Sequence, residues 1–290
     1  MGCTREQLNR LFSGTLLRKS ATLQSSNPYL EYPGVKPNPR YSKNNPHPKL
    51  YEIIDRNRVS YQQTLASFLQ FKDCFLRIPT DKPDQSQGPF WHCVWLPPLD
   101  LVALYSLLCL NNPKKYYEIG SGWSTKFARR AILDHSLQTK IVSIDPSPRA
   151  EIDSICDHVI RKPLEELSLS TFDDLATNDI LFVDGSHRCC MNSDVTVLFL
   201  DVLPRLLSGV LVEFHDIFLP YDYPFEWRER WYSEQYLLGT HILAEGDKLD
   251  IILPNAFISL DAELNEVLYP LWNKLGTNAV YGGSFWMRKR

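Results

Sequence analysis

The chain has 290 residues, of which 44% are hydrophobic and 22% are charged, and its formal net charge at pH 7 is −3. These values are typical of a soluble globular protein with one large domain and attachments, or with two domains. The lack of a strong basic charge argues against nucleic acid as the main partner. The longest apolar run, at residues 101–110, is too short to span a membrane.

The seven cysteines have no spacing typical of a disulfide framework, and the adjacent Cys189 and Cys190 do not form a zinc knuckle. We therefore predict reduced thiols and a cytoplasmic protein.

The first third of the chain differs in composition from the rest. A short helix is predicted over residues 8–17. Residues 27–48, "NPYLEYPGVKPNPRYSKNNPHP", contain so much Pro and Asn that neither a helix nor a strand can propagate. We predict an extended arm there, which packs either on its own domain or on a second copy of the chain as a homo-oligomer. Residues 1–94 are assigned to an N-terminal extension and residues 95–290 to the main domain.

Helical periodicity returns over residues 49–72. The candidate buried positions in this segment are Ile53, Ile54, Val59, Leu65, Phe68 and Leu69. A second helix is predicted to run to about residue 110, with Asp100 as its N-cap.

Strands and helices then alternate along the chain. Strands are predicted at residues 115–119, 140–144, 158–160, 179–184, 209–216, 250–253 and 283–287. Helices are predicted at residues 124–135, 148–157, 192–207 and 226–240, with helix or loop at 164–175. Continuous apolar strands that alternate with helices predict an α/β fold, in which a mostly parallel, doubly wound sheet is covered on both faces.

The stretch "YYEIGSGWSTKFA", residues 116–128, places Gly120-Ser121-Gly122 between the first of these strands and the next helix. Glycines let the backbone come close to a ligand, and the start of a helix offers unpaired amides. The turn is therefore a candidate binding loop, and Ser124 belongs to the same loop.

Two features argue against a nicotinamide or flavin site at this loop. The third glycine of that fingerprint should stand at the position of Thr125. Glu118 at the strand end suits a ligand with a cationic amino-acid group better than a pyrophosphate. S-adenosylmethionine carries an ammonium and a sulfonium and meets this requirement. Asp145, at the end of the next strand, is placed to accept hydrogen bonds from ribose hydroxyls, although a dinucleotide would use it equally well.

Four stretches together carry a family resemblance: "YYEIGSGWSTKFARRAI", "SIDPSPRAEID", "LFVDGSHRCCMNSDV" and "FHDIFLPYDYP". They resemble the class I S-adenosylmethionine-dependent methyltransferases, and among these a bacterial small-molecule group that includes sugar O-methyltransferases. The resemblance covers residues 95–290. It implies a Rossmann-like seven-stranded sheet whose last strand is antiparallel. By position it assigns the cofactor loop and the ribose acid to Glu118, Gly120, Ser121, Gly122, Ser124 and Asp145. It also implies an adenine-side turn at Lys162-Pro163-Leu164.

Two later strands end in residues suited to chemistry, Asp184 and His187 after one and His215 and Asp216 after the other. The carboxyl ends of parallel strands meet at one rim, so these residues are expected beside Glu118. Two routes to methyl transfer stay open. Asp184 and Asp216 could hold Mg²⁺, which lowers the pKa of a bound hydroxyl, although His215 stands where relatives place a second acid. Alternatively, His187 or His215 acts as general base beside Asp184.

The leading interpretation is a methyltransferase that methylates an oxygen of a small molecule such as a sugar or glycoside. The aromatic segment at residues 218–232 is a candidate cover for that substrate. Two alternatives are an enzyme of another class that uses a nucleotide cofactor, such as an oxidoreductase or a hydroxylase-like relative, and a non-catalytic binding module on the same fold.

Overall fold

The computed structural model describes residues 37–82, 88–93, 95–245, 249–276 and 281–290. The predicted helix at residues 8–17 and the first part of the predicted arm, residues 27–36, lie outside these ranges. From residue 37 to residue 47 the chain contains no helix and only one isolated bridge, as predicted for an arm. This described part packs on its own domain, because the backbone amides of Arg40 and Tyr41 donate to Asp222.

The helical segment predicted at 49–72 is present as α2 (Pro48–Asp55), α3 (Arg58–Phe68) and α4 (Lys72–Phe75), with a 3₁₀ turn between α3 and α4. Of the predicted buried positions, Ile54, Leu65 and Phe68 are fully buried, and Ile53 and Leu69 are partly buried. The prediction for Val59 is wrong, since its side chain is 65% exposed near the start of α3.

Helix α5 (Pro98–Asn111) is buried along almost its whole length. Pro98 occupies its first position, where the missing amide hydrogen costs nothing. The prediction that Asp100 caps this helix is wrong. Asp100 lies inside the first turn, is completely buried, and accepts hydrogen bonds from Asn255, Gly283 and Ser284 instead.

The seven strands form one sheet in the order β3-β2-β1-β4-β5-β7-β6. Their bounds are β1 (Lys115–Ile119), β2 (Lys140–Ile144), β3 (His158–Ile160), β4 (Ile180–Val183), β5 (Leu211–Phe214), β6 (Leu249–Pro254) and β7 (Phe285–Lys289). Strands β1 to β5 pair in parallel, and β7 is antiparallel to both β5 and β6. The predicted mostly parallel Rossmann-like sheet with an antiparallel last strand is confirmed.

The helices around the sheet match the prediction less closely than the strands do. The main helices are α6 (Trp123–Asp134), α7 (Asp194–Val197), α8 (Leu203–Arg205), α9 (Glu234–Glu245), α10 (Asn255–Leu260), α11 (Ala262–Glu266) and α12 (Tyr269–Leu275). The helix predicted at 148–157 is wrong: the segment holds a single 3₁₀ turn at Asp153–Ile155. Pro146 and Pro148 disfavour helical backbone before them, which accounts for the open loop.

Two other predicted helices are interrupted. The segment 192–207 divides into α7, a π turn at Leu198–Val202, and α8. The segment 226–240 divides at Trp231, whose left-handed backbone separates a 3₁₀ turn at Phe225–Arg230 from α9. Helices α10 to α12, between β6 and β7, were not predicted.

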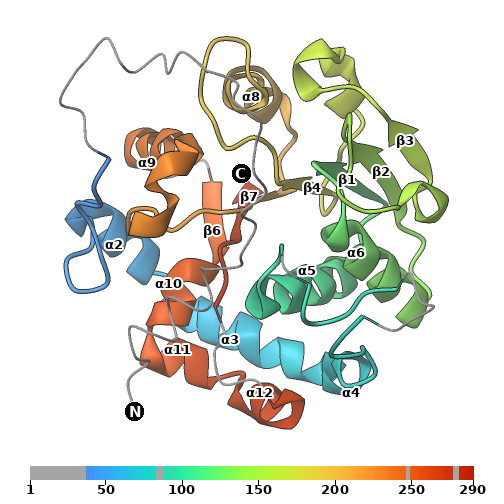
Figure 1. The fold of residues 1–290 in the computed structure, drawn as a ribbon, viewed down its shortest axis with the longest axis horizontal. Coiled ribbons are helices and arrows are strands. Elements are labelled where there is room, and N and C mark those ends of the chain that lie inside the picture. Colours follow the sequence, from blue (N-terminus) through green and yellow to red (C-terminus); the bar gives the residue numbers. More distant parts are fainter. Residues whose placement is uncertain (1–36, 83–87, 94, 246–248, 277–280) are drawn as a thin grey trace.

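The sheet is covered on both faces, with α5 and α6 on one side and α8 on the other (Figure 1). Buried residues of α2, α3 and α4 belong to the same hydrophobic cluster as the strands. The described part of the N-terminal extension therefore shares its core with the sheet. Within the described residues, no helix has both the length and the apolar character that crossing a membrane requires.

Candidate active site

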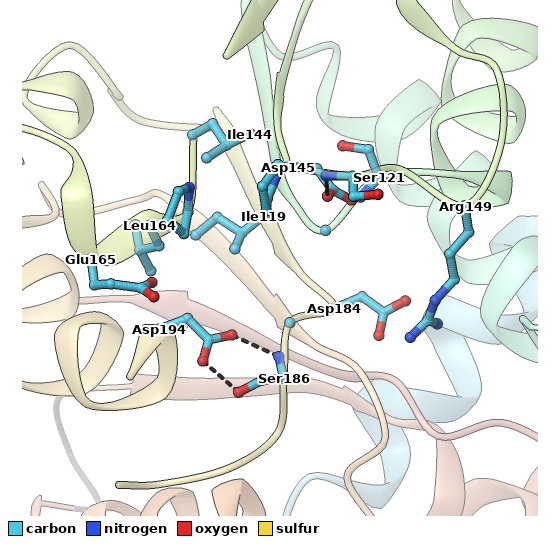
Figure 2. A pocket seen from close by; sticks show the side chains of 15 residues that line it. Ile119, Ser121, Ile144, Asp145, Arg149, Leu164, Glu165, Asp184, Ser186 and Asp194 are labelled. Atoms are coloured by element: carbon cyan, nitrogen blue, oxygen red, sulfur yellow. Dashed lines mark hydrogen bonds between the residues drawn. The ribbon is translucent and has the colours of Figure 1, made fainter. Parts of the chain in front are cut away.

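A cavity of about 320 Å³ lies at the carboxyl ends of β1, β2 and β4, where ligands bind in open α/β sheets. Its volume is at the lower end of the range for small-molecule sites. Figure 2 shows the lining side chains projecting toward one another from several loops. The lining residues are Ile119, Gly120, Ser121, Ile144, Asp145, Pro146, Ser147, Arg149, Pro163, Leu164, Glu165, Asp184, Gly185, Ser186 and Asp194.

The predicted glycine loop forms one wall of this cavity. Gly120 has a φ of +77°, and a Cβ atom there would lie 1.9 Å from the carbonyl oxygen of Asp184. Only glycine meets both conditions, because a side chain would be strained and would overlap the backbone after β4. Gly120 and Ser121 line the cavity, whereas Gly122 and Ser124 do not. Glycine at position 120 thus lets the loops after β1 and β4 approach closely.

Glu118 lies beneath the loop and not in the cavity. Its carboxylate is completely buried and accepts hydrogen bonds from Tyr116, at 2.9 Å, and from Thr125. The Thr125 hydroxyl in turn accepts the backbone amide of Gly122 at 3.0 Å. Burial raises the pKa of Glu118 to about 7. The structure therefore differs from the expectation that this carboxylate faces the ligand: Glu118 supports the loop from below.

Asp145 lies where the sequence places the ribose acid, at the end of β2 and in the wall of the cavity. Its two carboxylate oxygens accept the backbone amides of Ser121 and Ser147, each at 2.7 Å. These bonds orient the carboxylate, and each oxygen keeps a lone pair for another donor.

The side of the cavity nearest β3 is partly apolar. Of the predicted adenine-side turn, Pro163 and Leu164 line the cavity together with Glu165, while Lys162 does not. Ile144 adds an aliphatic surface from the end of β2. This end can hold a flat, weakly polar ring.

His187 connects the cavity to a buried cluster of carboxylates. Its Nε2 lies 3.1 Å from Oδ1 of Asp184, and its Nδ1 lies 2.9 Å from Oε2 of Glu234. The bond to Glu234 is buried, whereas Asp184 is partly exposed and lines the cavity. Asp216 lies 3.5 Å from the same Nε2 atom.

His215 is surrounded by carboxylates in a similar way. Its Nδ1 lies 3.4 Å from Asp184 and 3.5 Å from Asp216, and its Nε2 lies 3.4 Å from Asp100. These contacts lack hydrogen-bond geometry, so they act through charge. The four residues predicted at the two strand ends are thus brought together, and Asp184 lies between both imidazoles.

The electrostatics of this cluster follow from its composition. Burial alone would lower the pKa of both histidines, but the surrounding carboxylates outweigh burial and raise the two pKa values well above the usual range. Burial alone would raise the pKa of Asp184, but the charges of His215 and His187 lower it. Burial raises the pKa of Asp216 and of Glu234. The surrounding carboxylates therefore favour the protonated, imidazolium form of both histidines.

Backbone strain occurs at two of these residues. His187 and Asp216 have φ values of +59° and +56°, which side-chain-bearing residues rarely adopt. His187 is held in place because its carbonyl accepts the amides of Ser233 and Glu234. Such strain persists where the surroundings over-determine the backbone, often at functional sites.

The side chains of Asp184 and Asp216 face the histidines, since each lies within 3.5 Å of His187 Nε2 and of His215 Nδ1. Among the described residues, no group of three or more His, Cys, Asp or Glu side chains is arranged to hold a metal ion. The predicted Mg²⁺ site at Asp184 and Asp216 stays a prediction.

Several residues of the site were missed or misjudged by sequence reasoning. Glu234 and Asp100 come from distant helices, and only their acidic character could have drawn attention to them. Asp194 lines the cavity and accepts hydrogen bonds from the amide and hydroxyl of Ser186. Arg149 also lines the cavity and had not been assigned a role.

Residues 117–217 match a family model described as a methyltransferase domain. This range runs from β1 past the end of β5 and contains all of the residues that line the cavity. The order of the strands and the antiparallel β7 agree with the same assignment. The chain contains a methyltransferase domain with the strand order of the class I fold. The resemblance of its sequence to the S-adenosylmethionine-dependent methyltransferases is thereby confirmed.

Comparison with curated proteins finds no significant match to the methyltransferase. Solved structures with a similar fold include an O-methyltransferase from Bacillus cereus in complex with S-adenosylhomocysteine. It is 15% identical, with a TM-score of 0.42, over 79% of this chain and 91% of that chain. The methyltransferase PaMTH1 from Podospora anserina, bound to S-adenosylhomocysteine, is 17% identical, with a TM-score of 0.41, over 82% and 96%. The O-methyltransferase TomG from Streptomyces achromogenes, bound to S-adenosylmethionine, is 15% identical, with a TM-score of 0.34, over 84% and 98%.

Proposed function

We propose that this methyltransferase transfers the methyl group of S-adenosylmethionine to a hydroxyl oxygen of a small molecule such as a sugar or glycoside. One observation carries the proposal. Asp184 lines the cavity and at the same time contacts both buried histidines. Asp184 therefore connects the two histidines, which can exchange protons, to the space in which the methyl donor would bind.

The residues along the cavity match the successive parts of S-adenosylmethionine. Asp145 would accept the ribose hydroxyls, and Ile144 and Leu164 would contact the adenine ring. Gly120 and Ser121 bring the backbone close to the rest of the ligand. Glu118 supports this loop and adds negative charge beneath a cationic ligand when it is ionised. Gly122 and Ser124 shape the start of α6 without lining the cavity.

A proton balance links the donor to the histidines. The donor supplies an electrophilic methyl group on a positively charged sulfur. A positive charge beside Asp184 lowers the pKa of the neighbouring imidazoles, so one of them loses its proton. That neutral imidazole, His187 or His215, then receives the proton of the acceptor hydroxyl by way of Asp184, which lines the cavity, as the oxygen attacks the methyl group. The sulfur becomes neutral in the same step, and the total charge of the site does not change.

The proposed mechanism uses the histidines and not Mg²⁺, because Asp184 and Asp216 are turned toward the imidazoles. Mg²⁺ accompanies the donor in one of the similar structures. A turnover rate that is unchanged in a chelator is expected here, once an acceptor is known.

The state of the cysteine thiols is relevant to the cellular compartment of the protein. All six cysteines in the described part of the chain are free. We propose a cytoplasmic location on this basis, since disulfides are rare in reducing compartments.

The test of the proposed function is a binding titration followed by an acceptor screen. Calorimetry should show that the protein binds S-adenosylhomocysteine and does not bind NAD. Asp145→Asn should weaken that binding roughly ten- to a hundredfold, because a carboxylate that accepts two hydroxyls makes charge-assisted hydrogen bonds. Incubation with S-adenosylmethionine and a panel of sugars, glycosides, phenols and amines should then yield a product heavier by one CH₂ unit.

Asp201→Asn is the matched control, because this aspartate is exposed and does not line the cavity. Its affinity for S-adenosylhomocysteine should equal that of the wild type. Binding of NAD without binding of S-adenosylhomocysteine would refute the proposal, and methylation of amines alone would refute its O-methyltransferase part.

A further inference from the structure

More acidic than basic side chains line the cavity. Four lining residues are acidic, Asp145, Glu165, Asp184 and Asp194, and among the described lining residues Arg149 alone is basic. The donor proposed above carries a sulfonium, an ammonium and one carboxylate. The acidic residues suit the first two groups, whereas the carboxylate requires a cation.

Arg149 lies at the end of the cavity opposite the adenine side. It belongs to the loop after β2, and its Cβ atom lies 4.0 Å from the position that a Cβ atom on Gly122 would take. Figure 2 shows its guanidinium pointing toward the same end of the cavity as Asp184, away from Leu164 and Glu165. An extended ligand with adenine near Leu164 and ribose near Asp145 would place its amino-acid part near Arg149.

The guanidinium of Arg149 is held without being neutralised. It lies 4.5 Å from the ring centroid of Trp95, a cation–π contact that restricts its motion and leaves its N–H donors available. Within the described residues it forms no salt bridge with a carboxylate. The nearby Arg161 is different, because it donates to Ser143 and Asp145 and pairs with Asp153.

We propose that Arg149 forms the subsite for the carboxylate of the methyl donor's amino-acid part. The proposal rests on the proposed function. A guanidinium matches a carboxylate with two parallel hydrogen bonds, and the contact with Trp95 reduces the entropy lost when they form. Arg149 is thus a specificity-determining residue, which favours donors that carry the full amino acid.

The test compares ligands with and without the carboxylate by calorimetry. Arg149→Gln should weaken binding of S-adenosylhomocysteine roughly ten- to a hundredfold, the value of a hydrogen bond between charged groups. The same substitution should change binding of decarboxylated S-adenosylhomocysteine or of 5′-methylthioadenosine by less than about threefold, since these ligands lack the carboxylate. Arg149→Lys should lie between the wild type and Arg149→Gln, because it keeps the charge and loses the planar fork.

Arg205→Gln is the matched control, because Arg205 is an exposed arginine paired with Asp173 outside the cavity. It should bind all three ligands like the wild type. If Arg149→Gln weakened the binding of all three ligands equally, the substitution would have a general effect on the loop, and the proposed subsite would be wrong. Unchanged binding of S-adenosylhomocysteine in that variant would overturn it too, and the proposed function would stand. If the wild type fails to bind S-adenosylhomocysteine, the proposed function itself is wrong.

Discussion

The two buried histidines show how neighbouring charges determine the protonation of a side chain. His187 contacts Asp184 and Glu234, and His215 lies within 3.5 Å of Asp184, Asp216 and Asp100. The carboxylates raise both histidine pKa values and so favour the protonated imidazoles. A base must be unprotonated before it can act. The proposed mechanism therefore requires that a cationic donor displaces a proton from this cluster, whereas the neutral sulfur of the product does not.

Proton release on binding tests this requirement. At pH 6.5 the amino groups of S-adenosylmethionine and S-adenosylhomocysteine are both mainly protonated. Calorimetry in two buffers of different ionisation enthalpy should show that S-adenosylmethionine releases up to about one more proton than S-adenosylhomocysteine does. His187→Asn or His215→Asn should reduce this difference, whereas His158→Asn, an exposed histidine on β3, should not. Equal proton release by the two ligands in the wild type would contradict the mechanism.

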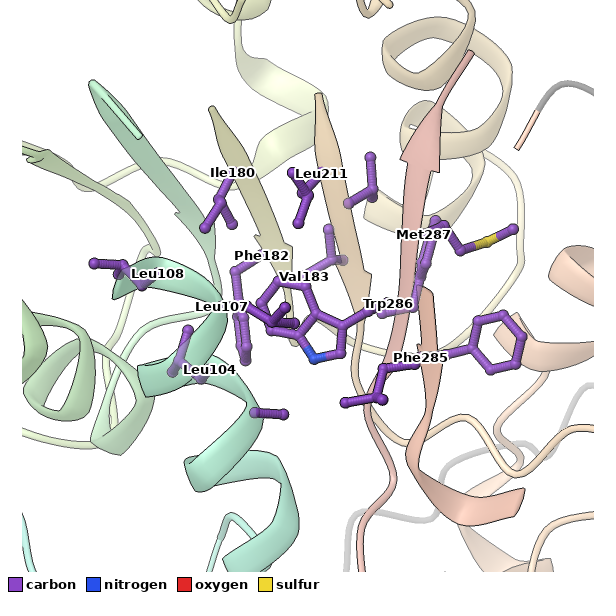
Figure 3. Packing of buried hydrophobic residues seen from close by; sticks show 14 of the residues in the cluster. Leu104, Leu107, Leu108, Ile180, Phe182, Val183, Leu211, Phe285, Trp286 and Met287 are labelled. Atoms are coloured by element: carbon purple, nitrogen blue, oxygen red, sulfur yellow. The ribbon is translucent and has the colours of Figure 1, made fainter. Parts of the chain in front are cut away.

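At the scale of elements, α5 joins the sheet to the loops that carry the site. Figure 3 shows Leu104 and Leu107 of α5 near Phe182 of β4 and the Trp286 indole of β7. The rings of Phe182 and Trp286 meet edge to face, with centroids 6.2 Å apart. The packing of α5 against these rings fixes the position of the helix. The buried Asp100 in its first turn is therefore held next to His215.

Asp100 also ties α5 to the residues that lead into β7. It accepts the amides of Gly283 and Ser284 at 2.7 Å and 3.0 Å, and the side-chain amide of Asn255 at 2.7 Å. Asp100→Ala leaves these buried donors unpaired and should lower the free energy of unfolding by about 2–5 kcal/mol. Denaturant titration followed by circular dichroism measures this loss. Asp201→Ala, at an exposed position, should change stability by less than about 0.5 kcal/mol, and similar values for the two variants would contradict the assignment.

At the scale of the whole molecule, the described part of the N-terminal extension folds as part of the methyltransferase. Phe68 of α3 is fully buried in the cluster that also contains the strands. Helix α3 contacts α5, α11 and β6, and α2 contacts α9. These contacts predict that α2 to α4 unfold together with the sheet and not as a separate unit.

Phe68→Ala tests this coupling, because removal of a buried ring should destabilise the protein by about 3–5 kcal/mol. Trp91 is the one tryptophan in the extension, and its indole donates to the Phe75 carbonyl of α4, so the test uses a Trp91→Phe background in which tryptophan fluorescence reports on residues 95–290. The denaturation midpoint seen by fluorescence should fall together with the midpoint seen by circular dichroism. Val59→Ala on the same helix, where Val59 is 65% exposed, should leave both midpoints nearly unchanged. A fluorescence transition that Phe68→Ala does not move would show that the extension is independent.

The sequence by itself determined those parts of this protein that depend on neighbours along the chain. Three predicted strands, at residues 115–119, 140–144 and 158–160, match β1, β2 and β3 at both ends. Continuous apolar runs between turns leave few alternatives, and the order of strands and helices then determines which strand ends share a rim. Gly120, Asp145 and Asp184 could be predicted as neighbours of one cavity for this reason.

Only the tertiary structure decided which side chains meet within that rim. Glu118 lies in β1, the strand that leads into the glycine loop, but it is bound beneath the loop by Tyr116 and Thr125. Glu234 reaches His187 across 47 positions of the chain, and Asp100 reaches His215 from a helix that packs on the sheet. Such pairs depend on how whole elements pack and on what burial does to a charge. No pattern along the sequence encodes either of these, because both arise between segments that are neighbours only in the folded chain.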